Sequence, residues 1–173
     1  MAYDASPELR EFTAEKKARL LLALYAGNLG LSERTLRYFL GGCYLPSKKD
    51  SVDISKKAFD ILKSNKPKWV KNDKAYLNSS QLPKGLGLTI EHMVPIVYMH
   101  KYIKSQWESL SEEDLKTLIE KYFKIAIITK DENDSLNAKE FDIKDKMPRG
   151  WEPGTGAYDE RYTFCRIEMH KSK

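Results

Sequence analysis

The adjacent residues Glu91 and His92, together with Asn133, have side chains of the types needed to hydrolyse a phosphodiester bond. That reaction needs a water molecule that is deprotonated near neutral pH, and histidine is the side chain whose unperturbed pKa lies in that range. It also needs a cation to offset charge on the phosphate and on the leaving oxygen. Carboxylate and amide oxygens are ligands that a hard divalent cation accepts. We therefore expect Glu91 and Asn133 to hold one such ion and His92 to act as the base.

Two apolar runs and one helix-start signal would position these side chains. Residues 88–90, Leu-Thr-Ile, form a short run that leads into the Glu-His pair, and residues 125–128, Ile-Ala-Ile-Ile, form the clearest buried strand in the chain. Thr129 and Glu132 have the spacing of a capping box, so a helix begins where the second strand ends. If the two strands pair and the helix lies across them, Asn133 lies in the first turn of that helix.

The same residues resemble the signature of the HNH nuclease family. Residues 91–95, Glu-His-Met-Val-Pro, look like its first half, which is Asp or Glu, then His, two aliphatic residues and Pro. Residues 124–133 resemble its second half in layout and spacing, with an apolar strand, a polar turn and Asn at the start of a helix. The stretch is similar to the HNH domains of CRISPR effector nucleases and of several restriction-type endonucleases. The resemblance covers residues 88–137, less than a third of the chain.

This resemblance implies a ββα-metal core, in which two strands and a helix surround one divalent cation. By the resemblance, His92 is the general base, and Glu91 and Asn133 are the metal ligands. Oxygen ligands of this kind favour Mg²⁺ and also accept Mn²⁺ or other divalent ions. The implied activity is that of an endonuclease that hydrolyses DNA, above all double-stranded DNA, in restriction or in defence against foreign DNA.

The chain departs from the family pattern in two places. The family has a further Asn where this chain has Lys124, and that Asn helps to fix the loop that carries the catalytic His. Another group must take over this role, or the site is weakened. The segment between the two halves, residues 96–123, is longer than the family's minimal loop and has the patterns of two helices.

Several further residues are candidates for supporting the site or for contacting DNA through its backbone or bases. They are Lys124, Lys130, Asn137, Arg149, Trp151 and Arg161. Each also has a structural interpretation, because an exposed lysine needs no function and Trp151 can pack over the core as part of a lid. His100 is expected on a helix surface, and His170 in a frayed tail.

Composition and charge are consistent with a polyanionic partner. The chain is 41% hydrophobic, enough to form a core, and carries a formal net charge of +5, although a solvated Lys-rich surface explains the same excess. Cys43 and Cys165 exclude a four-cysteine zinc site and a disulfide framework and fit a reducing, cytoplasmic setting. The N-terminus lacks the pattern of a secretory signal, and no apolar run is long enough to span a membrane.

The N-terminal half is expected to be helical. Three helices are predicted, at residues 7–26, 33–40 and 55–64. A turn at residues 28–30 precedes the second helix, and the glycines at 41–42 are expected to end it. This spacing is typical of a helix-turn-helix whose second helix would present Arg34 and Arg37 to DNA. An ordinary helical hairpin packed on the core has the same pattern.

Polar residues 65–87 are predicted to form a connection with little regular structure. The predicted organisation is therefore α+β and mostly helical. A helical region at 1–87 would serve as scaffold, DNA contact or dimer contact, and the HNH-type core with a C-terminal extension would occupy 88–173. A homodimer would supply the second active site that double-strand cutting needs. Two alternatives stay open: a catalytically inactive HNH-like DNA-binding protein, and an RNA-directed or toxin-like nuclease.

Overall fold

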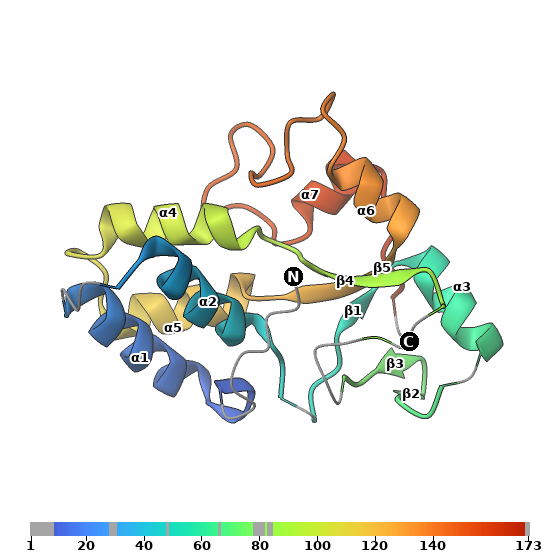
Figure 1. Cartoon of the computed structure of the whole chain (residues 1–173), viewed down its shortest axis with the longest axis horizontal. Coiled ribbons are helices and arrows are strands. Elements are labelled where there is room, and N and C mark those ends of the chain that lie inside the picture. The colour runs from blue at the N-terminus through green and yellow to red at the C-terminus, as the bar shows by residue number, and fades with distance from the viewer. Residues whose placement is uncertain are drawn as a thin grey trace.

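The computed structural model (Figure 1) describes residues 9–27, 31–47, 49–65, 67–77, 82 and 85–171. Its elements in chain order are η1 (Leu9–Glu11), α1 (Ala14–Ala26), α2 (Glu33–Tyr44), β1 (Asp53–Ile54), α3 (Lys56–Asn65), β2 (Val70–Lys71), β3 (Lys74–Ala75), β4 (Leu88–His92), α4 (Ile96–Gln106), α5 (Glu112–Tyr122), β5 (Ile125–Thr129), α6 (Lys130–Leu136) and α7 (Glu160–Phe164). The fold is α+β, mostly helical with a small mixed sheet, which confirms the predicted class. In Figure 1, α1, α2, α4 and α5 gather at one end of the molecule, and α6 and α7 lie above the long β4–β5 pair.

The first helical segment differs from the prediction. The sequence predicts one helix over residues 7–26, whereas the structure has η1 and then α1, with a break at Thr13. The Thr13 hydroxyl accepts a hydrogen bond from the backbone N–H of Lys16 and so caps α1. Residue 7 and the predicted turn at 28–30 lie outside the described residues.

The second helix corrects a further prediction, because α2 continues through Gly41 and Gly42 to Tyr44. Each glycine in a helix interior costs about 1 kcal/mol relative to alanine. Both glycines are buried here, and α2 packs against α4, so tertiary packing outweighs that local cost. Ser32 caps the start of α2, and α3 matches the predicted helix at 55–64 to within one residue.

The central sheet has the strand order β1-β5-β4. β4 and β5 pair antiparallel, with Glu91 opposite Ala126 and His92 opposite Ile125, which confirms the predicted pairing of these two strands. β1 pairs in parallel with the other edge of β5, with Asp53 beside Ala126. The sequence does not predict β1, because a strand of two residues is too short for its periodicity to be detected.

The described part of residues 65–87 contains two short strands that the sequence does not predict. β2 and β3 form an antiparallel hairpin whose turn residues are Asn72 and Asp73. Both have positive φ, 50° and 59°, the backbone conformation of a two-residue type I′ turn. Lys71 and Lys74 flank the turn, and neither gives the apolar alternation that marks a hairpin in a sequence.

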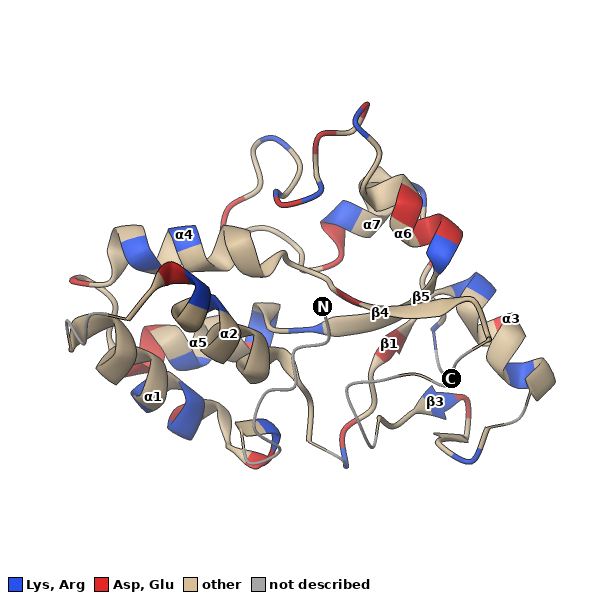
Figure 2. Cartoon of the chain, viewed as in Figure 1, with Lys and Arg blue, Asp and Glu red and all other residues tan. Residues whose placement is uncertain are grey.

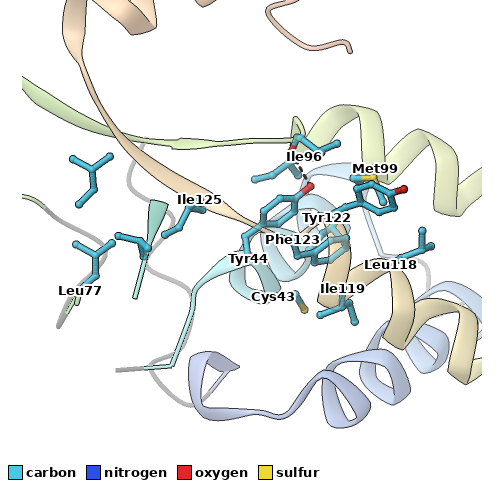
Figure 3. Close-up of a cluster of buried hydrophobic side chains, with 14 of the residues drawn as sticks. Cys43, Tyr44, Leu77, Ile96, Met99, Leu118, Ile119, Tyr122, Phe123 and Ile125 are labelled. Carbon is cyan, nitrogen blue, oxygen red and sulfur yellow. Dashed lines mark hydrogen bonds between the residues drawn. The ribbon is translucent and has the colours of Figure 1, made fainter. Parts of the chain in front are cut away.

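The two faces of the sheet pack against different hydrophobic clusters. Ile125 and Ile127 point into the larger cluster, which also contains residues of α1, α2, α3, α4 and α5 (Figure 3). Ala126 and Ile128 point into the smaller one, together with residues of α6 and α7. The larger cluster and the central sheet both join residues on the two sides of the predicted boundary at residue 87.

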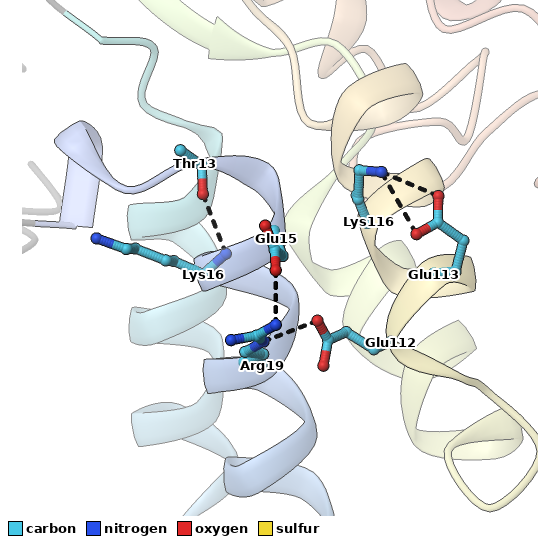
Figure 4. Close-up of polar contacts among 7 residues, drawn as sticks. All are labelled: Thr13, Glu15, Lys16, Arg19, Glu112, Glu113 and Lys116. Carbon is cyan, nitrogen blue, oxygen red and sulfur yellow. Dashed lines mark hydrogen bonds and ion pairs between the residues drawn. The ribbon is translucent and has the colours of Figure 1, made fainter.

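Exposed ion pairs join α1 to α5 at the edge of the larger cluster. Arg19 lies between Glu15 of its own helix and Glu112 of α5, at 2.6 and 2.8 Å (Figure 4). Because all three side chains are solvated, we expect each pair to contribute little to stability. In the described part of the chain, no helix is both long and apolar enough to cross a membrane.

Candidate functional site

The candidate site is built from β4, β5 and α6. β4 ends at His92, β5 returns antiparallel beside it, and α6 follows β5 without a loop. The predicted capping box lets α6 begin directly after β5. The Thr129 hydroxyl accepts a hydrogen bond from the backbone N–H of Glu132, and the Glu132 carboxylate accepts one from the backbone N–H of Thr129. α6 then packs against both strands, so the chain has the order strand, strand, helix on which the sequence analysis relied.

Glu91 lies on the α6 face of the sheet, where it is paired with Arg161 of α7. Arg161 is fully buried, and its Nη1 lies 3.2 Å from Oε1 of Glu91. The same nitrogen donates to the backbone carbonyl of His92 at 3.1 Å, and Nη2 donates to the carbonyl of Lys144 at 3.2 Å. Burial raises the pKa of Glu91, and the nearby guanidinium lowers it in part. Arg161 therefore supplies a fixed positive charge at the end of β4.

His92 lies on the opposite face of β4 from Glu91, because successive side chains of a strand alternate. Its ring packs edge-on against Tyr44, with the ring centroids 4.8 Å apart. Burial and, to a smaller extent, the charge of Arg161 together lower the pKa of His92 to about 4. The imidazole is therefore neutral at neutral pH, which is the form that can accept a proton.

Asn133 shares the face of Glu91. Within α6, Glu132 points toward β1, where its carboxylate accepts a 2.6 Å hydrogen bond from the Ser55 hydroxyl. Leu136 is buried in the smaller cluster between α6 and the sheet. Since a helix turns about 100° for each residue, the order around α6 is Glu132, Leu136, Asn133. Asn133 is consequently turned toward β4, and it is half-buried there.

Contacts to backbone carbonyls, together with ring stacking, fix the loop after His92. The backbone N–H of Met93 donates to the carbonyl of Lys124 at 3.0 Å. The Tyr44 hydroxyl donates to the carbonyl of Val94 at 2.8 Å, and the Tyr44 ring stacks on Phe123 at 4.4 Å (Figure 3). The residue at position 124 thus contributes through its carbonyl oxygen, which any side chain would permit.

Removal of the Tyr44 hydroxyl should show how much its hydrogen bond to the Val94 carbonyl contributes to the stability of the protein. We expect Tyr44→Phe to lower the free energy of unfolding by about 1–2 kcal/mol, because the buried Val94 carbonyl loses its donor while the ring contacts remain. Urea denaturation followed by circular dichroism measures the change. Tyr98→Phe is the matched control, since its hydroxyl bonds the Trp151 carbonyl from a half-buried position and should cost less. Equal stability of Tyr44→Phe and the wild type would contradict the anchoring role.

The supporting residues predicted from the sequence fall into two groups. Lys130 and Arg149 are exposed and available to a phosphate, and exposed Asn137 instead donates through its amide to the carbonyl of Asn133 at 2.7 Å. Trp151 is only 5% exposed and donates to the Ala157 carbonyl, so it packs as the lid interpretation predicts. Trp151 and the fully buried Arg161 are therefore not contacts for DNA in this structure.

Two histidine predictions are wrong. His100 is buried rather than on a helix surface, with its Nδ1 2.7 Å from the Tyr25 hydroxyl. His170 is not in a frayed tail, because its ring stacks on Phe59 at 3.6 Å and its backbone N–H donates to the Ile54 carbonyl. Both errors arise because contacts between distant segments decide the burial of a single side chain.

Sequence reasoning missed Asp53, a carboxylate that lies across β5 from Glu91. Asp53 of β1 and Glu91 of β4 flank Ala126 in the same register, so both carboxylates lie on the α6 face of the sheet. Burial raises the pKa of Asp53. Tyr162 of α7 is fully buried in the smaller cluster. No signal in the sequence links β1 to the Glu-His pair.

The donors on the α6 face fit a hard divalent cation in their chemistry. Glu91 and Asn133 offer a carboxylate and an amide oxygen from the same side of β4, and the Arg161 ion pair engages only Oε1 of the carboxylate. The described residues contain no cluster of three or more His, Cys, Asp or Glu that could hold an ion. Water and a substrate phosphate would have to complete the shell of an ion bound to these two donors.

Comparisons with known proteins were negative: no family model matches the chain, and neither a curated protein nor a solved structure is significantly similar to it. The functional assignment therefore rests on the residues and their geometry.

Proposed function

We propose that the protein is a divalent-metal-dependent endonuclease of the HNH type that hydrolyses phosphodiester bonds of DNA. One observation carries the proposal: the Glu-His-Met-Val-Pro segment lies at the end of the first of two antiparallel strands, and the second strand runs directly into a helix that packs on both. This order of strand, strand and helix supports the ββα-metal core that the resemblance implies, with Asn133 in the helix that packs on the strands. As the resemblance implies, restriction or defence against foreign DNA is the proposed setting.

Glu91 and Asn133 are the residues that would hold the cation. A bound Mg²⁺ or Mn²⁺ supplies charge that offsets the developing charge on the phosphate and the leaving oxygen. Arg161 holds Glu91 in place through Oε1 and adds a second positive charge close by. Because Arg161 is itself fixed by two backbone carbonyls, Glu91 does not have to be ordered when substrate binds.

His92 is the proposed general base. Its neutral ring at the end of β4 can take a proton from water, and the Tyr44 contact fixes the ring plane. The imidazole and the Glu91 carboxylate point to opposite faces of the strand, so a substrate phosphate would have to bind across the strand end to meet both.

A second candidate function is DNA binding without cleavage. It is favoured by the Arg161 ion pair, which gives Glu91 a structural partner, and by the packing of His92 against Tyr44. In this case the ββα arrangement is a scaffold, and the net charge of +5 supplies the affinity for a polyanion.

Incubation with supercoiled plasmid separates the two candidates. We expect the wild-type protein to convert plasmid to nicked or linear forms with Mg²⁺ or Mn²⁺, and to stop doing so when EDTA is added. Gel shifts of the same plasmid fragments report binding independently. Binding without any cleavage under either metal would refute the nuclease and support the second candidate. Single-stranded DNA and RNA, offered in parallel, show whether the substrate is DNA as proposed.

A further inference from the structure

A basic pocket with a volume of about 310 Å³ lies between α2 and α4, away from the candidate site. Arg37 of α2 and Lys101 and Lys104 of α4 contribute three cations to its lining, against the single carboxylate of Glu33. Figure 2 shows basic residues on both of these helices. Lys104 is paired with Glu33 at 2.7 Å, so Arg37 and Lys101 remain as the cations that a ligand would meet.

The pocket is also lined by His100, which is 3% exposed. Its Nδ1 lies 2.7 Å from the Tyr25 hydroxyl, whereas Nε2 is buried and has no hydrogen-bond partner among the described residues. Buried polar atoms of native proteins are almost always paired, so an unpaired one calls for an explanation. A ligand oxygen reaching Nε2 from the pocket provides one.

The hydrogen bond to Tyr25 determines what kind of ligand Nε2 requires. If the Tyr25 hydroxyl donates to Nδ1, the neutral ring carries its proton on Nε2, and one donor is left unpaired. The opposite tautomer would leave two groups unpaired, the Tyr25 hydroxyl proton and the Nε2 lone pair. Burial raises the pKa of Tyr25 and lowers that of His100, so the phenol stays protonated and the imidazole neutral. The unpaired group of this pocket-lining residue is therefore an N–H donor, which needs an acceptor.

We propose that this pocket binds a phosphate group, with Arg37 and Lys101 neutralising its charge and the Nε2–H of His100 donating to one of its oxygens. A phosphate presents several acceptor oxygens at once, which suits a guanidinium, an ammonium and an imidazole N–H that converge from two helices. The phosphate would be either a free ion or a phosphate of a nucleic-acid backbone. The proposal does not depend on nuclease activity, because none of these residues belongs to the β4–β5–α6 site.

NMR of the ¹⁵N-labelled full-length protein tests the site directly. Inorganic phosphate is titrated at constant ionic strength with chloride as the reference anion, and a short DNA duplex is titrated in a parallel sample. We expect the Nε2–H resonance of His100 to shift in a saturable way with at least one of the two ligands. A shift with inorganic phosphate identifies a free-ion site, whereas a shift with the duplex alone identifies a backbone contact.

A matched pair of double variants provides the control. Arg37→Gln with Lys101→Gln should weaken binding at least tenfold, because a hydrogen bond to a charged group contributes about 1.5–3 kcal/mol and about 1.4 kcal/mol corresponds to tenfold. Lys63→Gln with Lys139→Gln removes the same charge from exposed positions that do not line the pocket and should leave the affinity within about twofold. Equal weakening in both double variants, or a His100 resonance that moves with neither ligand, would overturn the proposal.

Discussion

His92→Gln is expected to reduce plasmid cleavage at saturating metal by at least a hundredfold. A positioned general base typically contributes about 10²–10⁴-fold to the rate, and glutamine cannot accept the proton of water near neutral pH. The amide keeps a polar side chain of similar length beside Tyr44, so the fold should persist. Initial rates of nicking, measured together with the thermal unfolding midpoint, separate lost chemistry from lost structure.

His170→Gln is the matched control for this substitution. His170 is also in a ring contact with an aromatic residue, since it stacks on Phe59. It follows Met169, which bridges to Ser55 after β1, so it is distant from the end of β4. Its replacement should leave the cleavage rate within about twofold. A His92→Gln protein that is folded and cuts as fast as the wild type would remove His92 from the mechanism.

The pH dependence of cleavage should reveal the environment of His92. Its pKa is lowered to about 4, so the basic form of the imidazole is already the major one at pH 5. At saturating metal, which keeps the Glu91 carboxylate ionised, we therefore expect the rate to hold as the pH falls from 7 to 5 and to decline only as the pH approaches 4. A histidine with an ordinary pKa near 6.5 would instead lose most of its activity across that range. A midpoint near 6.5 would show that the catalytic base is not a buried His92.

Arg161→Met is expected to lower the free energy of unfolding by about 3–5 kcal/mol, the usual cost of removing one partner from a buried ion pair. The loss is large because Arg161 is fully buried and also donates to the carbonyls of His92 and Lys144. Methionine preserves much of the side-chain volume, so the change reports the lost charge and hydrogen bonds. Urea denaturation measures it, with Arg149→Met as the exposed control, which should stay within about 0.5 kcal/mol of the wild type.

A double-mutant cycle then isolates the interaction free energy between Glu91 and Arg161. If Glu91 and Arg161 stabilise each other, the double variant Glu91→Gln with Arg161→Met should lose less free energy of unfolding than the two single variants lose in sum. The reason is that glutamine leaves no uncompensated carboxylate in a partly buried position. If the two losses of unfolding free energy are strictly additive, or if Arg161→Met is as stable as the wild type, the ion pair contributes little to stability.

The local signals in the sequence were reliable where a few neighbouring residues decide the structure. The capping box at Thr129, and the pairing of the strands before and after the long insertion, are present as predicted. Hydrogen bonds between residues three apart and the alternation of apolar residues are properties of the chain itself. The order strand, strand, helix around the Glu-His pair could therefore be predicted from the sequence.

The sequence failed where distant segments determine the outcome. Nothing local indicates that β1 joins the sheet, that α2 passes through two glycines, or that His100 is buried. These features depend on which surfaces meet when the helices pack, and that information is spread over the whole chain. The same holds for Arg161, which comes from 70 residues away to pair with Glu91.

By itself the sequence determined the residue types at the end of β4: a carboxylate, an imidazole and, one strand later, the amide of Asn133. Only the tertiary structure decided how they are held. The pleat turns Glu91 and His92 to opposite faces, Arg161 takes one oxygen of the carboxylate, and Tyr44 with the Lys124 carbonyl fixes the loop. The physical reason is that spacing along a strand sets only the face of a side chain. Its partners on that face come from elements that pack there, and here these are α2 and α7.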